Sequence, residues 1–190
     1  DQFTVEEALR EKIMTIGENM KIRRFARYEG EVVTYSHGGG RIGVMVKFDA
    51  PADIAAKDGF KAMAKDVAMQ VAALAPKYVS SEDVSEEYKE HEKSILLAQA
   101  KNENPDKPEN IIEKMIIGRL NKELKEVCLM EQAYVKAEDG KQTVAKYLQQ
   151  VSKEVGADIK ITGFVRFETG EGLEKKSEDF AAEVAAQMNA

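Results

Sequence analysis

The sequence contains one cysteine and two histidines, and no apolar run approaches the ~20 residues that a membrane-spanning helix needs. The lone Cys128 has no partner for an internal disulfide, which is consistent with a reducing compartment. Its place at the end of an apolar stripe predicts a packed, inert thiol. No positively charged and then apolar segment of the secretory type opens the chain. These features predict a soluble, cytoplasmic protein that does not associate with membranes.

Motifs for catalysis and metal binding are also scarce. The chain has neither H-E-x-x-H nor C-x-x-C, and it has no G-x-S-x-G nucleophile elbow. Residues 38–43 satisfy G-x-G-x-x-G, but they lead into a β-branched run and not into a helix whose amides could bind a pyrophosphate. We interpret these glycines as a hairpin turn, with a dinucleotide site as the alternative that this context disfavours. We therefore expect no enzyme activity, no cofactor and no bound metal.

The chain is acidic, with 34 Asp and Glu residues, 28 Lys and Arg residues and a net charge of −6. Binding to nucleic acid requires clustered Lys and Arg to neutralise phosphates. The composition therefore argues against a nucleic-acid partner. The carboxylates are spread along helix faces and mixed with lysine, which is typical of solvated surfaces and not of an acid–base site.

Hydrophobic periodicity divides the chain into helices and strands. The expected helices cover residues 3–16, 60–74, 84–98, 112–127, 143–155 and 174–188. The expected strands are residues 32–35, 42–48 and 159–168. Two prolines between the third and fourth of these helices predict an antiparallel helical hairpin over residues 84–128.

An internal repeat organises these elements. Residues 21–29 align without gaps on residues 160–168, with Lys, Ile, Phe, Arg and Glu identical at five of nine positions. Two strands that both alternate apolar and polar side chains could look alike by chance. The alternative is a tandem duplication whose unit ends in this strand. It predicts an α+β fold with a duplicated β-β-α(n)-β antiparallel-sheet unit, in which the second copy is complete and the first is truncated.

This duplication predicts three regions. Residues 1–30 hold the last helix and the closing strand of the first unit. Residues 31–172 form the second unit, which includes the protruding helical hairpin 84–128. Residues 173–190 form a C-terminal helix module. Because unit one lacks its own hairpin, we expect the chain to be the C-terminal part of a longer protein, and its start at Asp1 is consistent with that expectation.

Three segments together resemble the elongation factor Ts family. Residues 16–24, Ile-Gly-Glu-Asn-Met-Lys-Ile-Arg-Arg, look like a stretch of that family, and residues 37–44 look like its hairpin signature. Residues 162–185 are similar to its C-terminal segment. The resemblance covers nearly the whole chain in family order, and its motifs are specific in combination.

The resemblance implies a guanine-nucleotide exchange factor that promotes GDP release from elongation factor Tu during translation elongation. It also implies a set of positions that contact this partner. They are Ile16, Gly17, His37, Val135, Phe180, Val184 and Met188. From the residues alone, His37 is a solvated turn residue or a partner contact, because it lies at the edge of a glycine-rich hairpin.

The chain departs from the family in two respects. The N-terminal three-helix domain is absent, and so is the Thr-Asp-Phe-Val motif, whose Asp-Phe pair acts as a wedge in the family. Residues 52–55 carry only an echo of it, with Ile54 in place of Phe. We therefore expect a fragment that binds the partner but is poor in exchange. The alternative is a structural module without exchange activity, forming a homodimer through the second core unit.

Overall fold

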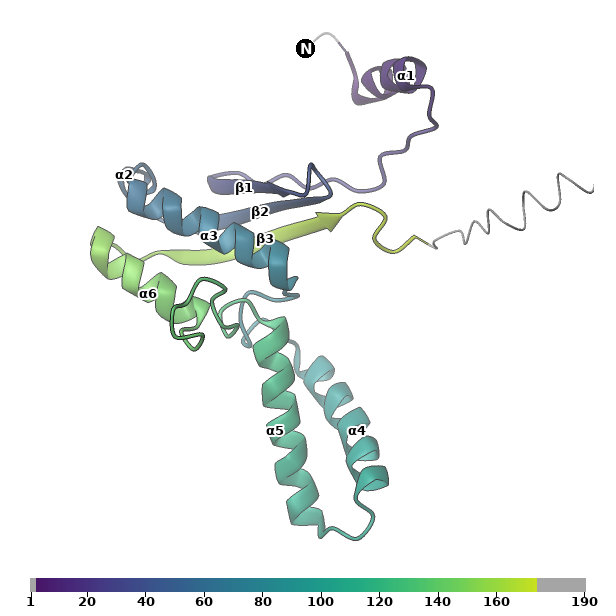
Figure 1. Cartoon of the computed structure of the whole chain (residues 1–190), viewed down its shortest axis with the longest axis vertical. Coiled ribbons are helices and arrows are strands. Elements are labelled where there is room, and N and C mark those ends of the chain that lie inside the picture. Colours follow the sequence, from purple (N-terminus) through teal and green to yellow (C-terminus); the bar gives the residue numbers. More distant parts are fainter. Residues whose placement is uncertain (1–2, 174–190) are drawn as a thin grey trace, which may run out of the picture.

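An antiparallel sheet of three strands organises the computed structural model, which describes residues 3–173 (Figure 1). The strands are β1 (Glu31–His37), β2 (Ile42–Asp49) and β3 (Lys160–Glu168), and β2 lies between the other two. The element order β1-β2-α2-α3-α4-α5-α6-β3 has the predicted form of two strands, several helices and a closing strand, and the short α2 was not predicted. The α+β class is confirmed.

Strand β2 alternates between a buried and a more exposed face, as period-two side chains require. Val44, Val46 and Phe48 are almost fully buried on its inner face. Across the ladder with β1, Tyr35 pairs with Val44, so it lies on the same inner face. Residues 38–40 connect the two strands with φ of 60°, 67° and 96°, values that favour glycine. The hairpin-turn interpretation of the glycine motif is therefore confirmed.

Helices cover the inner face of the sheet. Helix α3 (Asp58–Leu74) contacts all three strands, and α6 (Val144–Val155) packs against α3. The rings of Phe60 on α3 and Phe48 on β2 meet edge to face, with centroids 5.3 Å apart. The short α2 (Ala52–Ala55) buries Ile54 in the same core. This apolar contact between helix and sheet is the main source of stability in the described residues.

A helical hairpin projects from this body, as predicted (Figure 1). It consists of α4 (Glu86–Glu103) and α5 (Glu109–Val127), which enclose a small core of their own made of Ala100, Ile112 and Ile116. At its base the backbone is tied to the body, since the Leu129 amide donates to the Tyr78 carbonyl at 2.9 Å. The hairpin is therefore anchored at one end only.

Helix α1 (Val5–Ile16) is capped at both ends. Thr4 and Glu7 form a capping box at its start, which satisfies two of the free amide groups of the first turn. At its end, Gly17 adopts φ of 79° and donates its N–H to the Ile13 carbonyl at 2.8 Å. None of its residues is buried, and Met14 is 84% exposed. The helix was predicted, but the described residues provide no core for its apolar side.

The strand predicted over residues 21–29 is wrong, because these residues are irregular in the structure. They cross the outer face of the sheet: the Arg24 guanidinium lies 4.6 Å from the centre of the Phe167 ring, and the Tyr28 side chain approaches Gly163. A strand needs a neighbour to share its backbone hydrogen bonds. A segment that lies across a sheet face, and not at a sheet edge, has no such neighbour. The duplication of the whole unit therefore stays a prediction.

Two further expectations concern the C-terminal helix and membrane-spanning segments. The helix predicted over residues 174–188, with Phe180, Val184 and Met188, lies outside the described residues. Among the helices in residues 3–173, none combines the length and the apolar character needed to cross a membrane.

Candidate partner-binding site

His37 and Val135 line one hollow of about 450 Å³ beside the C-terminal part of α3. Its apolar floor comes from β1, β2 and α3, and its charged rim comes from β3 and the loop before α6. The lining residues are Tyr35, His37, Ile42, Met69, Ala72, Ala73, Val135, Lys136, Arg166 and Glu168. An apolar floor within a polar rim is the usual arrangement of a protein–protein contact. The structure thus brings together two of the predicted partner-binding residues that lie far apart in the sequence.

His37 is the last residue of β1, and strand alternation places it on the inner side of the sheet with Tyr35. Its ring Nδ1 and the Tyr35 hydroxyl are 3.0 Å apart and hydrogen-bonded. The side chain nevertheless remains exposed. This hydrogen bond orients the ring at the surface, and the contact of His37 with a partner stays a prediction.

Val135 is held in place by the buried side-chain amide of Gln70, a residue that the sequence analysis missed. The Gln70 side chain is fully buried, and its Oε1 accepts the Val135 N–H at 2.9 Å. Its Nε2 donates to the Ala133 carbonyl at 3.0 Å and to Gln132 Oε1 at 3.1 Å. The signal in the sequence was a polar residue within the apolar stripe of α3. These bonds leave the Val135 side chain 47% exposed at the surface.

Asp66 joins the same loop to α3 through three hydrogen bonds. Its carboxylate accepts from the Tyr134 hydroxyl at 2.6 Å, from Lys136 Nζ at 2.7 Å and from the Tyr147 hydroxyl at 3.2 Å. The two tyrosine rings stack with centroids 4.1 Å apart. Burial raises the pKa of Asp66, but the bonds from Lys136 and the tyrosines outweigh it, and the net pKa is lowered. Burial and the Asp66 carboxylate raise the pKa of Tyr134.

Replacing Asp66 by asparagine is expected to lower the free energy of unfolding at pH 7 by about 1.5–3 kcal/mol, the range for hydrogen bonds to a charged group. A carboxyl with a lowered folded pKa stabilises above its unfolded pKa, and this contribution is lost as pH falls through the folded value. The difference between wild type and Asp66→Asn should therefore shrink in acid. Urea unfolding from pH 7 to pH 3 measures it. Asp53→Asn, at an exposed carboxylate, is the control, and a constant difference across the range would contradict the assignment.

The remaining polar groups around the hollow are engaged with one another or with the backbone. Arg166 Nη2 pairs with Glu168 Oε2 at 2.8 Å, and its Nε donates to the Ala72 carbonyl at the end of α3. In the part of the chain that the structure describes, no group of three or more His, Cys, Asp or Glu side chains could hold a metal ion. Burial raises the pKa of Cys128 to about 11, so its thiol is protonated at neutral pH. The inert-thiol prediction agrees with this.

Among the described residues, Ile16 and Gly17 do not line the hollow. Ile16 is 55% exposed and Gly17 follows it at the end of α1, a helix that lies apart from the sheet (Figure 1). Ile54, in the echo of the wedge motif, is 5% exposed and packs in the core. A buried side chain cannot enter another protein, so residues 52–55 present no wedge in this structure.

Comparison with known proteins agrees with the motifs described above. Residues 1–171 match the protein family described as Elongation factor TS. The chain belongs to this family. An elongation factor Ts of Clostridium perfringens is 53% identical over 187 residues, which are 96% of this chain and 59% of that protein.

Two further elongation factor Ts relatives give a similar result. The protein of Clostridioides difficile is 50% identical over 188 residues, which are 98% of this chain and 60% of that protein. The protein of Clostridium botulinum is 50% identical over 188 residues, with 97% and 59% covered. The chain therefore spans about three fifths of the length of these elongation factor Ts relatives.

Proposed function

We propose that this chain binds elongation factor Tu in the cytoplasm and carries part of the surface by which elongation factor Ts promotes GDP release. The observation that carries the proposal is the shared hollow of His37 and Val135, two positions that the family resemblance relates to the partner. Membership of the family, at 50–53% identity to relatives over nearly the whole chain, supports it.

Nucleotide exchange needs no bond-making groups. A factor that binds the nucleotide-free partner more tightly than the loaded partner shifts the equilibrium towards release by differential affinity alone. The hollow offers contact surface, but the buried Ile54 offers no wedge. We infer that the chain binds elongation factor Tu and accelerates GDP release poorly.

Stopped-flow release of a fluorescent GDP analogue from elongation factor Tu tests this inference. At equal concentration, the chain is expected to be at least about tenfold slower than the full-length factor of Clostridium perfringens, a difference of ~1.4 kcal/mol in the barrier. Binding is measured in parallel by calorimetry on nucleotide-free elongation factor Tu. Val135→Ser should weaken binding, whereas Ile95→Ser, at an exposed apolar position on α4, should not. A release rate equal to that of the full-length factor would contradict the exchange-poor assignment.

The outer face of the sheet favours a second candidate, a structural module that self-associates through the core unit. This face presents the half-buried apolar side chains of Met45, Val165 and Phe167, and Phe25 beside it is 88% exposed. Sedimentation velocity separates the two candidates. A distribution that does not change when nucleotide-free elongation factor Tu is added would favour the structural module over the exchange factor.

A further inference from the structure

A second hollow lies in the angle where α5 leaves the body, apart from the hollow of His37 and Val135. It measures about 580 Å³ and lies between the base of α5 and the loop that precedes α6. Its lining residues are Leu74, Lys122, Lys125, Glu126, Glu131, Gln132, Ala133, Gly140, Lys141 and Thr143. We call this hollow, together with the outward face of α5 above it, the basic elbow.

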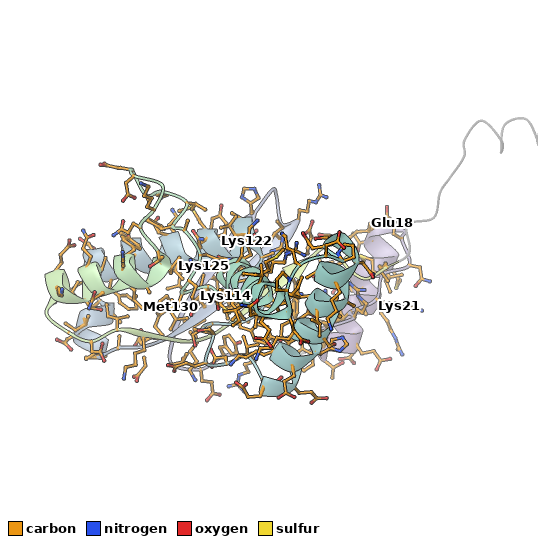
Figure 2. All side chains as sticks on the ribbon, turned by 90° about the horizontal axis from the view of Figure 1, so that it is seen from below. Glu18, Lys21, Lys114, Lys122, Lys125 and Met130 are labelled. Atoms are coloured by element: carbon orange, nitrogen blue, oxygen red, sulfur yellow. The ribbon has the colours of Figure 1, made fainter. Side chains whose placement is uncertain are left out.

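The outward face of α5 follows from the packing of the hairpin. Ile112, Ile116 and Leu120 are buried, and α5 packs against α4, so positions about half a turn away point to the other side. That side carries Lys114, Lys122 and Lys125. Of the carboxylates of α5, that of Glu126 lines the hollow beside Lys122 and Lys125. Figure 2 shows the three lysines together on the side of α5 turned away from α4.

These lysines share one face of a helix in a chain of net charge −6. Within the described residues, Lys114, Lys122 and Lys125 form no ion pair, although other lysines of the hairpin, such as Lys89 and Lys101, do. Their charges are therefore available to a ligand. A local positive surface on an acidic protein selects a partner of opposite charge.

A neighbouring hollow of about 820 Å³ lies past the loop. Lys141 and Lys146 line it together with Glu138 and Asp139, and its third lysine, Lys136, is paired with Asp66. Two nearby carboxylates are already engaged: Glu131 Oε1 accepts from the Ser81 amide and hydroxyl, and Asp139 Oδ1 accepts two backbone amides. Both are therefore directed towards their own loops.

Apolar side chains accompany the lysines. Leu74 in the hollow is 45% exposed, and Ile111 and Ile117 on α5 are 40% and 56% exposed. The hollow itself has no arginine and no aromatic ring in its lining. Single-stranded nucleic acid is held mainly by stacking on aromatic rings and by arginine. Lysines beside exposed aliphatic groups suit an acidic protein segment with apolar anchors better.

We propose that the basic elbow binds an acidic segment of another protein, with carboxylates pairing with Lys122, Lys125 and Lys141 and an aliphatic side chain entering beside Leu74. The concave angle between the hairpin and the body gives such a segment two walls. This interaction is independent of the hollow that contains His37 and Val135.

Fluorescence anisotropy with a defined probe tests the proposal. The probe is a fluorescein-labelled peptide with the sequence (Glu-Leu-Leu-Glu)3, added to the full chain in 50 mM and in 300 mM salt. The double variant Lys122→Glu/Lys125→Glu should bind the peptide at least about tenfold more weakly, because it replaces two attractions by two repulsions. The affinity of the wild type should also fall in high salt, since exposed charges are screened.

The control variant is Lys61→Glu/Lys65→Glu, which makes the same change of net charge on the exposed side of α3. It should bind the peptide within about twofold of wild type. Val135→Ser should likewise leave peptide binding unchanged, so this test is separate from that of elongation factor Tu binding. Equal weakening by the two charge reversals would overturn the proposal, as would tighter binding of a labelled twelve-residue uridine RNA than of the peptide.

Discussion

Replacing Phe60 by alanine is expected to lower the free energy of unfolding by about 3–5 kcal/mol, the range for removing a buried phenylalanine from a packed core. Phe60 is 2% exposed and its ring contacts Phe48 edge to face at 5.3 Å. It therefore joins α3 to the centre of the sheet. Loss of the ring removes both apolar burial and an aromatic pair, and it leaves a cavity that the neighbouring side chains fill only partly.

Urea unfolding followed by circular dichroism measures this loss. Phe25→Ala is a matched control, because the same side chain is 88% exposed there. It should change the free energy of unfolding by less than about 0.5 kcal/mol. Equal destabilisation by the two substitutions would mean that the contact between helix and sheet is not the main source of stability.

Replacing Gln70 by leucine is expected to cost about 2–4 kcal/mol of stability, since a buried donor or acceptor left without a partner costs ~1–3 kcal/mol. Leucine is close to glutamine in size, but it strands the Val135 N–H and the Ala133 carbonyl in the interior. The substitution should also release the loop that presents Val135. The substitution is thus expected to weaken binding to elongation factor Tu as well as to lower the free energy of unfolding.

Gln149→Leu, at an exposed position on α6, provides the control for Gln70→Leu. It should leave the urea midpoint nearly unchanged. Hydrogen exchange separates this local role from a general loss of stability. In Gln70→Leu the exchange rate of the Val135 amide should rise more than the rates of the amides in α3, whereas general destabilisation would raise them all alike. Unaltered protection of Val135 would contradict the role assigned to Gln70.

Short-range patterns predicted most of the elements correctly. The glycine hairpin, the helical hairpin and the strand over residues 160–168 were all read from spacing, because local periodicity and turn residues act over a few positions. The segment 21–29 shows where this reasoning failed. It shares five of nine residues with β3, but a strand forms only where a partner strand lies beside it. In the described residues this segment crosses the sheet instead.

The candidate site, too, was only partly predictable from the sequence. The resemblance named His37 and Val135 separately, but only the fold shows that they line one hollow. Gln70 stands out only as a polar residue within an apolar stripe, and Asp66 not at all. Their roles depend on partners more than 60 residues away, which no local pattern identifies. The lysines of α5 likewise became a surface only once the helix pairing showed which side faces outward.

The scarcity of cysteine and histidine predicts no metal or thiol site, and the motifs of residues 16–24, 37–44 and 162–185 were enough to indicate the elongation factor Ts family. The family match confirms the second of these. These are properties of residue identity and local spacing. Tertiary structure alone decided that Ile54 is buried, that residues 21–29 are not a strand, and that Val135 is presented by a buried amide. Burial and hydrogen-bond partners arise from contacts between distant parts of the chain, which no local pattern encodes.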